Sequence, residues 1–144
     1  MIFSQTSSYA VRAMVHLADV GNGQPTRVDD IASELEVPRN YLSKILHALT
    51  RAGLLSSVRG PGGGFTLTQP PSTIRLVDVI RHFDARDSEL TCLMGQKRCR
   101  ADEPCAAHER WSVVKHQVTT FLSDTTISDL LASQRHTPPP SSPG

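Results

Sequence analysis

Residues 38–67, PRNYLSKILHALTRAGLLSSVRGPGGGFTL, change from a helical to an alternating pattern partway along their length. In the first half, apolar residues recur every three or four positions from Leu42 to Leu49, and Pro38 suits a first helical position. In the second half, apolar residues flank the glycine-rich tip RGPGGG, residues 59–64, which predicts two short strands. The stretch therefore predicts a helix over residues 38–52 followed by a β-hairpin.

A second short helix is predicted immediately upstream, in TRVDDIASELEV, residues 26–37. Thr26 is its predicted N-cap, with Asp29 three residues later. About four residues, VPRN, join this helix to the next one, whose exposed side is polar and basic. Two helices in this arrangement are typical of a helix-turn-helix, and a hairpin directly after them is typical of a winged helix.

The rest of the chain adds helices on both sides of this unit. Apolar residues at helical spacing predict helices over residues 7–20, 75–84 and 126–133. A longer amphipathic helix is predicted in AHERWSVVKHQVTTFLSDT, residues 107–125, and a chain of 144 residues has little core to cover its apolar stripe. We expect this helix to form a dimer; the alternative is that it packs on the chain's own core.

The predicted fold class is mostly α with a small β-hairpin: a winged helix-turn-helix domain plus a long dimerisation helix. Four segments are expected. They are a DNA-binding domain, a cysteine-containing sensor loop, a dimerisation helix with a short C-terminal helix, and a disordered tail, over residues 1–84, 85–107, 108–133 and 134–144.

The formal net charge of +1 conceals an uneven distribution of acids. Between Glu36 and Asp78 lie 41 residues without one acid, among them four arginines and one lysine. An ordinary solvated surface would explain a shorter gap, whereas a face that meets a polyanion explains this one. The motifs inside the gap favour double-stranded DNA as the partner.

Side chains on the exposed side of the second helix and at the hairpin tip are the predicted DNA contacts. We expect the helix to read base edges and phosphates in the major groove, and the tip to enter the minor groove. The predicted contact residues are Arg39, Asn40, Tyr41, Ser43, Lys44, His47, Arg51, Arg59, Gly60, Pro61 and Gly62.

Several other classes of protein are disfavoured. No apolar run approaches the ~20 residues of a membrane helix, and the N-terminus lacks the basic region of a signal peptide, so we expect a cytoplasmic protein without a membrane partner. The histidines lack neighbouring nucleophiles, and RGPGGG lacks the Lys-Ser/Thr of a phosphate loop, so no enzyme is predicted.

All three cysteines lie in TCLMGQKRCRADEPCAAHERW, residues 91–111. Gaps of six and five residues separate Cys92, Cys99 and Cys105, and His108 follows after two more. Zinc sites use tighter cysteine pairs, and longer gaps suit a loop around a larger cluster. The residues alone leave an iron–sulfur cluster, a thiol switch, a zinc site and a plain loop open.

Together, SSYAVRAMVHLA, the helix-turn-helix with VRGPGGG, and CLMGQKRCRADEPCAAHERW resemble the iron–sulfur cluster regulator (IscR-like) family of bacterial winged-helix repressors, over residues 1–133. The resemblance implies a homodimer that binds pseudo-palindromic promoter DNA. It also implies an iron–sulfur cluster on the cysteine loop, with Cys92, Cys99, Cys105 and His108 in the positions of its ligands. A 2Fe–2S cluster is the leading interpretation, and a 4Fe–4S cluster is the alternative.

Some nitric-oxide-sensing relatives take the fourth ligand from an acid near the N-terminus of the partner subunit. This chain has Ser7 and Ser8 there, and its first acid is Asp19, which favours ligation by His108. The predicted function is a regulator, expected to be a repressor, whose affinity for its operator depends on the cluster and so on iron–sulfur, redox or nitrosative status. The alternatives are a DNA-binding regulator with a thiol/disulfide or zinc switch, and an iron–sulfur carrier that binds no nucleic acid; the acid-free stretch disfavours the carrier.

Overall fold

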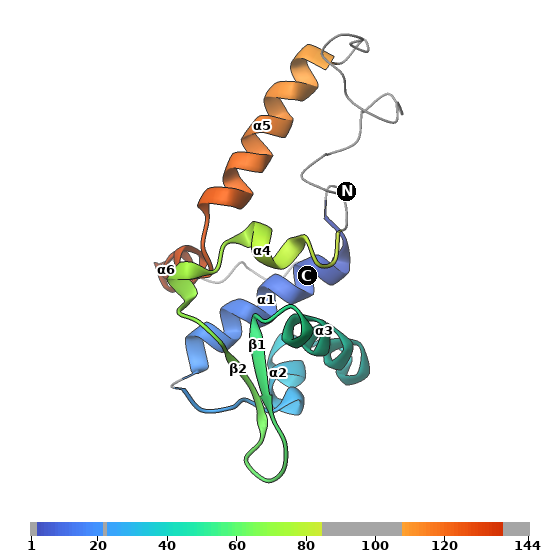
Figure 1. Cartoon of the computed structure of the whole chain (residues 1–144), viewed down its shortest axis with the longest axis vertical. Helices are drawn as coiled ribbons and strands as arrows, with labels where there is room; N and C mark the ends of the chain where they lie inside the picture. The colour runs from blue at the N-terminus through green and yellow to red at the C-terminus, as the bar shows by residue number, and fades with distance from the viewer. Residues whose placement is uncertain (1–2, 22, 85–107, 137–144) are drawn as a thin grey trace, which may run out of the picture.

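The computed structural model describes residues 3–21, 23–84 and 108–136 of the chain (Figure 1). Within these ranges the fold is mostly helical with one antiparallel hairpin, which confirms the predicted fold class. The elements are α1 (Gln5–Val20), α2 (Val28–Leu35), α3 (Arg39–Arg51), β1 (Leu55–Val58), β2 (Gly64–Leu67), a 3-10 turn η1 (Pro71–Thr73), α4 (Leu76–Ile80), α5 (His108–Asp124) and α6 (Ile127–His136).

Helix α1 lies at the centre and is in contact with α2, α3, β2, α4 and α6. Its apolar positions follow the helical repeat, and Ala10, Ala13 and Met14 are fully buried. Ser4 caps its N-terminus, because the Ser4 side chain accepts a hydrogen bond of 3.1 Å from the backbone N–H of Ser7. The helix thus supplies the surface on which the winged helix and α6 are both assembled.

The turn between α2 and α3 depends on a left-handed residue. Glu36 ends α2 at φ 56° and ψ 45°, a conformation that glycine adopts at lower cost. Its N–H donates to the carbonyls of Ala32 and Ser33, and Val37 is then buried before α3 begins at Arg39. Pro38 is the N-cap of α3, and the helix begins at Arg39, one residue later than predicted.

The predicted N-cap at Thr26 is wrong. Arg27 occupies that position, and Thr26 instead forms an antiparallel bridge with Phe65 of β2, with backbone hydrogen bonds of 3.0 and 2.9 Å. Phe65 is buried, and its partner across the hairpin is Ser57. The bridge joins the hairpin to the segment before α2, so that β2 is paired with β1 on one edge and with Thr26 on the other.

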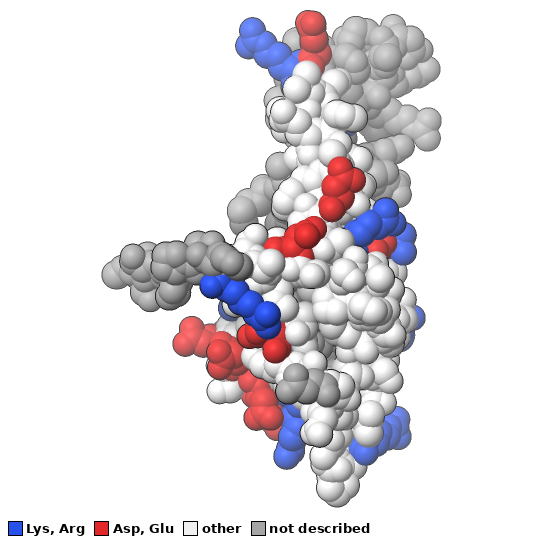
Figure 2. All heavy atoms as spheres, turned by 90° about the vertical axis from the view of Figure 1, so that its left-hand side faces the viewer, with Lys and Arg blue, Asp and Glu red and all other residues white. Residues whose placement is uncertain are grey.

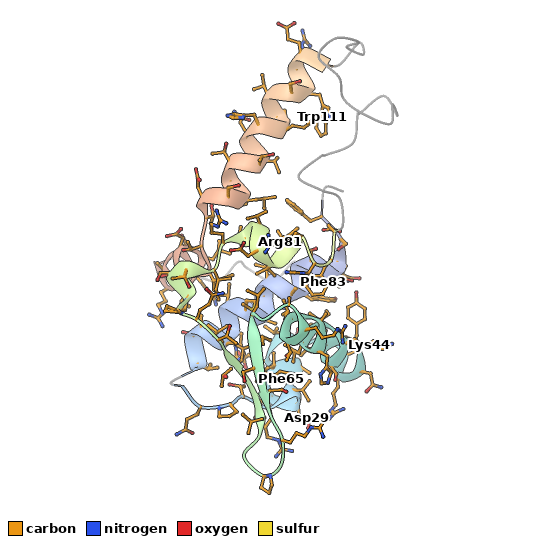
Figure 3. The ribbon with its side chains drawn as sticks, in the orientation of Figure 1. Asp29, Lys44, Phe65, Arg81, Phe83 and Trp111 are labelled. Carbon is orange, nitrogen blue, oxygen red and sulfur yellow. The ribbon has the colours of Figure 1, made fainter. Side chains whose placement is uncertain are left out.

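The C-terminal helices extend the fold on the far side of α1. Helix α4 ends at Ile80, earlier than the predicted Asp84, and residues 81–84 form a turn. Phe83 in this turn packs against the core (Figure 3). Helix α6 packs along α1, whereas α5 projects from the body at the end opposite the hairpin (Figure 1). None of the helices in the described ranges is long and apolar enough to cross a bilayer.

Candidate nucleic-acid interface

The two sides of α3 are sharply different. Leu42, Ile45, Leu46 and Leu49 point into the core and are at most 2% exposed. The other side carries the predicted contact residues: Arg39, Asn40, Tyr41, Lys44, His47 and Arg51 are exposed, and Ser43 is half-buried. Helix α3 therefore offers a continuous polar and basic surface with a rigid apolar anchor behind it.

Contacts within the protein orient three side chains of this surface. Arg39 forms an ion pair with Asp29 of α2, and both side chains stay more than half exposed. Tyr41 shares a hydrogen bond with the Thr6 hydroxyl of α1. The rings of His47 and Phe65 pack in a T-shaped arrangement, with centroids 5.6 Å apart and planes at 76°. Elements on either side of α3 thus hold its exposed face in place.

The hairpin tip is a compact turn. Gly63 donates a hydrogen bond of 2.9 Å from its N–H to the carbonyl of Gly60, and Gly62 lies at φ 78°. With Pro61 before it, this is the arrangement of a type II turn, in which proline precedes a left-handed glycine. Arg59, Gly60, Pro61 and Gly62 are all exposed at the tip.

The two last glycines of the tip have a different role. A Cβ on Gly63 would lie 2.2 Å from the carbonyl oxygen of Val58, and a Cβ on Gly64 would lie 2.3 Å from that of Thr26. Glycine is therefore required at both positions by close approaches within the protein itself. The predicted contact with DNA therefore concerns only the exposed part of the tip, residues 59–62.

Helix α3 and the hairpin lie next to each other, at the end of the molecule away from α5 (Figure 1). Lys44 extends outward from α3, and Asp29 of α2 lies below α3 in this view (Figure 3). The acid-free stretch contributes Arg39, Lys44, Arg51 and Arg59 to this end. The basic side chains of α3 and of the hairpin tip suit the phosphate backbone of a duplex.

Helix α5 has a contrasting surface. Its Val113, Val114 and Phe121 are 57, 40 and 50% exposed. Charged side chains gather at the tip of this helix, while the surface seen below the tip is largely uncharged (Figure 2). Large apolar side chains that remain in water on a projecting helix indicate a surface for another protein chain.

The predicted cluster ligands are only partly within the described structure. Cys92, Cys99 and Cys105 lie in residues 85–107, outside the described residues, and His108 is the first residue of α5. Over residues 3–21, 23–84 and 108–136, no three His, Cys, Asp or Glu side chains are grouped as metal ligands would be. The ligand set therefore remains a prediction from the sequence.

One carboxylate at the N-terminus of α1 was missed by sequence reasoning. Asp84 accepts hydrogen bonds from the N–H of Ser4 and the hydroxyl of Ser7. No local signal could have found it, because 77 residues separate Asp84 from Ser7. The contact brings Asp84 next to the first turn of α1.

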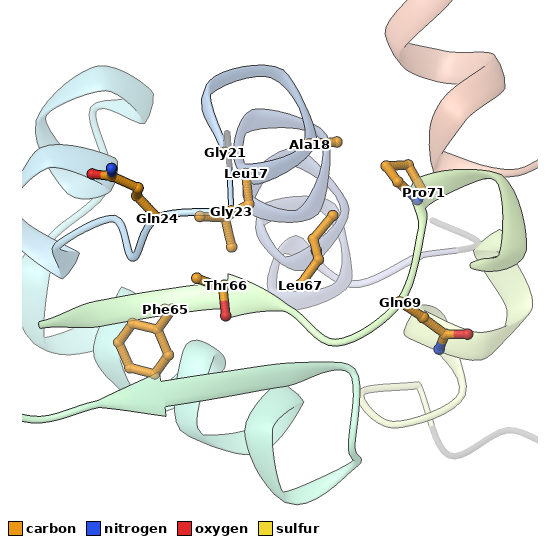
Figure 4. A pocket seen from close by; sticks show the side chains of 10 residues that line it. All are labelled: Leu17, Ala18, Gly21, Gly23, Gln24, Phe65, Thr66, Leu67, Gln69 and Pro71. Atoms are coloured by element: carbon orange, nitrogen blue, oxygen red, sulfur yellow. The ribbon is translucent and has the colours of Figure 1, made fainter.

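A small hollow of about 230 Å³ lies between the end of α1, β2 and η1 (Figure 4). Leu17, Leu67 and Pro71 contribute apolar lining, and Gln24 and Gln69 contribute amides. Typical small-molecule sites measure ~300–1,000 Å³ and combine an apolar lining with convergent polar groups. The size of this hollow gives little support to a small-molecule site there.

A basic helix of a helix-turn-helix beside a glycine-rich wing defines the class of this protein: it is a winged-helix regulator that binds DNA. The chain belongs to the Rrf2 family, whose description is "Iron-dependent Transcriptional regulator" and whose model matches residues 3–133. The resemblance inferred from the sequence motifs is thereby confirmed, and the protein is a transcriptional regulator rather than an enzyme.

Individual relatives agree with this assignment. The putative HTH-type transcriptional regulator of Aquifex aeolicus (strain VF5) is 40% identical over 134 residues, which cover 91% of this chain and 92% of that protein. The HTH-type transcriptional regulator IscR of Escherichia coli O1:K1 / APEC is 31% identical over 134 residues, covering 93% and 82%. The solved structure of CymR (YrzC), the global cysteine regulator of B. subtilis, matches with a TM-score of 0.79 at 29% identity, covering 92% of this chain and 98% of that one.

Proposed function

We propose that this chain forms a homodimeric repressor whose affinity for a pseudo-palindromic operator is set by an iron–sulfur cluster on its cysteine segment. The observation that carries the proposal is the separation of two surfaces. A polar and basic face on α3 and the hairpin lies at one end, and exposed apolar side chains on α5 lie toward the other. One end suits DNA, and the other suits a second copy of the chain.

The DNA-binding part of the proposal assigns separate roles to α3 and the wing. The residues at the start of α3, from Arg39 to Lys44, read base edges and phosphates in the major groove. His47 and Arg51, further along the helix, contact the phosphate backbone, and Arg59 enters the minor groove with the turn at Gly60–Gly62. In a dimer, two such units contact half-sites about one helical turn of DNA apart.

The dimer part of the proposal rests on α5. Burying Val113, Val114 and Phe121 against a second α5 would remove large apolar surface from water, which is the main favourable term in association. A two-fold arrangement places the same patch on both subunits and mirrors the symmetry of the operator.

The cluster part of the proposal rests on the donor set. Three thiols and an imidazole suit iron–sulfur ligation, and Lys97, Arg98 and Arg100 around Cys99 favour anionic sulfur ligands. Cys92, Cys99, Cys105 and His108 would hold the group, with a 2Fe–2S cluster preferred over 4Fe–4S. Similarity to IscR supports this assignment.

A second candidate is a regulator whose cysteines switch as thiols or bind zinc, without a cluster. Similarity to CymR, titled a global cysteine regulator, favours keeping this candidate. Two of the three cysteines would then form a reversible disulfide under oxidation.

Anaerobic purification followed by visible absorption and by iron and sulfide analysis separates these candidates. The cluster predicts a coloured protein with iron and sulfide in equal amounts, lost in Cys99→Ser. A colourless protein with free thiols or bound zinc would exclude the cluster and favour the second candidate. His108→Ala tests the fourth ligand separately, since an unaltered cluster spectrum in this variant would remove only the histidine assignment.

DNA binding is tested with Lys44→Ala and Arg59→Ala, and with Arg135→Ala as the matched control. Arg135 is exposed on α6 and pairs with Asp19, away from α3. Loss of a phosphate contact reduces the salt slope of binding by about one, and loss of a base contact costs about 1–3 kcal/mol. Equal affinities for all three variants and the unchanged protein would contradict the proposed interface.

A further inference from the structure

The first turn of α1 is attached to Asp84 on one side. The Ser4 N–H and the Ser7 hydroxyl both donate to Oδ2 of Asp84, at 3.1 and 2.6 Å. Ser7 is only 1% exposed, so its hydroxyl depends on a partner within the protein. A carboxylate at the N-terminus of a helix is also favoured by the helix dipole. The position of this turn therefore depends on Asp84.

The same turn holds α3 on its other side. Thr6 shares a hydrogen bond with the Tyr41 hydroxyl. The ring of Tyr9 meets the ring of Tyr41 edge to face, with centroids 5.7 Å apart and planes at 83°. Gln5 donates to the Tyr9 hydroxyl at 2.8 Å, which orients that ring. Tyr41 is 37% exposed, so one part of it is held by α1 while another part faces solvent.

We infer that Asp84 is a positioning residue for DNA binding, because it sets the position of the α1 turn that holds Tyr41 on α3. Thr6 and Ser7 are neighbours in one helical turn, so a displacement of Ser7 also moves Thr6. The inference rests on the proposed role of α3 as the helix that reads DNA. Asp84 also immediately precedes residues 85–107, and Cys92 follows eight residues later. A change in that segment that moves Asp84 would be transmitted to α3 through the Asp84–Ser7 and Thr6–Tyr41 hydrogen bonds.

A purely structural role for Asp84 predicts different results. If Asp84 only stabilised α1, its loss would lower the melting temperature and add independently to changes at Tyr41. If its charge acted only at long range, its removal would strengthen binding to polyanionic DNA. A positioning residue instead weakens binding when neutralised, and its effect depends on Tyr41. The direction of the change in DNA affinity and its dependence on Tyr41 therefore distinguish a positioning role from the other two.

The first experiment compares Asp84→Asn with Asp19→Asn, a matched loss of one charge at the exposed end of the same helix. The probe is a fluorescent 30-base-pair duplex that the unchanged full-length protein selects from a random pool. Asp84→Asn is expected to weaken binding about five- to twentyfold, within the ordinary range of coupling between sites. Asp19→Asn is expected to bind as the unchanged protein does or slightly more tightly. Ser7→Ala, a small change at a buried site, should weaken binding in the same direction, and it keeps the test valid if Asp84→Asn folds poorly.

The second experiment is a double-mutant cycle. In a Tyr41→Phe background, which keeps the ring contact with Tyr9 but loses the hydrogen bond with Thr6, the effect of Asp84→Asn on affinity should fall below about twofold, because the hydrogen bond that transmits it is already lost. Additive effects would overturn the inference, as would Asp84→Asn and Ser7→Ala proteins that bind as tightly as Asp19→Asn. If the unchanged protein selects no duplex, the proposed function fails and the inference fails with it. If the unchanged protein selects a duplex and the variants bind that duplex with unchanged affinity, the inference is refuted but the proposed function is not.

Discussion

Replacing Gly63 with alanine tests whether the wing depends on close packing within the protein. A Cβ at this position would lie 2.2 Å from the Val58 carbonyl oxygen and 2.8 Å from that of Gly60, so the backbone must move. Movement would break the 2.9 Å hydrogen bond from Gly63 to Gly60 and disturb the neighbouring pair of Val58 with Gly64. At about 1 kcal/mol per hydrogen bond, with further loss from strain, the gross cost is about 3 kcal/mol.

Alanine also lowers the entropy of the unfolded chain, which returns about 0.4–1 kcal/mol. The net loss for Gly63→Ala is then about 2 kcal/mol, or a fall of roughly 4–8 °C in melting temperature for a chain near this size. Displacing Arg59 at the tip should also weaken operator binding about tenfold. Gly62→Ala is the matched control: its Cβ would meet nothing within 4 Å, but its φ of 78° is left-handed. That variant should lose only about 1 kcal/mol.

Thermal unfolding followed by circular dichroism, at equal protein concentrations, measures the difference in stability between the two variants. Fluorescence anisotropy with the selected duplex measures the difference in affinity. A Gly63→Ala protein as stable as Gly62→Ala, or more so, would refute the reasoning, because it would show that the hairpin accommodates a side chain at the close approach.

Three further predictions concern other parts of the molecule. Glu36→Gly should raise the free energy of unfolding, measured in urea, by about 0.5–1 kcal/mol, because glycine adopts the left-handed conformation of Glu36 (φ 56°) at lower cost. Glu36→Gln should not raise it, and a loss of stability in the glycine variant would contradict the prediction. Asp29→Asn should tighten operator binding about two- to fivefold in anisotropy titrations, since it frees Arg39 from an exposed ion pair; weaker binding would count against a DNA contact by Arg39. Phe121→Glu should convert dimer to monomer in sedimentation experiments, whereas Val20→Glu, an exposed apolar position on α1, should not; a Phe121→Glu dimer would argue against pairing through α5.

The sequence by itself was sufficient for the elements of the winged helix. The apolar repeat from Leu42 to Leu49 predicted α3, and the glycine-rich tip between two stretches with apolar residues predicted the hairpin. These signals are local: a helix needs one apolar face at 3.6-residue spacing, and a tight turn needs residues such as Gly62 that accept its backbone angles. The family resemblance followed from the same local motifs.

Local signals were weaker at the boundaries of the elements. Thr26 has the side chain of an N-cap, yet its backbone is used by Phe65, whose pairing depends on where the hairpin folds back. Helix α4 ends at Ile80 because the following turn places Phe83 on the core. Neither packing partner is adjacent in the sequence, so propensity alone favoured a different boundary.

Tertiary structure alone decided which distant residues meet. It placed Asp84 on Ser7 across 77 residues, and Tyr41 on Thr6 across 35, so that one turn of α1 contacts both Asp84 and the helix proposed to bind DNA. Sequence periodicity determines which face of a helix is apolar, but it contains no record of what packs against that face. Such contacts arise only when all the helices are assembled around one core, and the path from Asp84 to α3 is one of them.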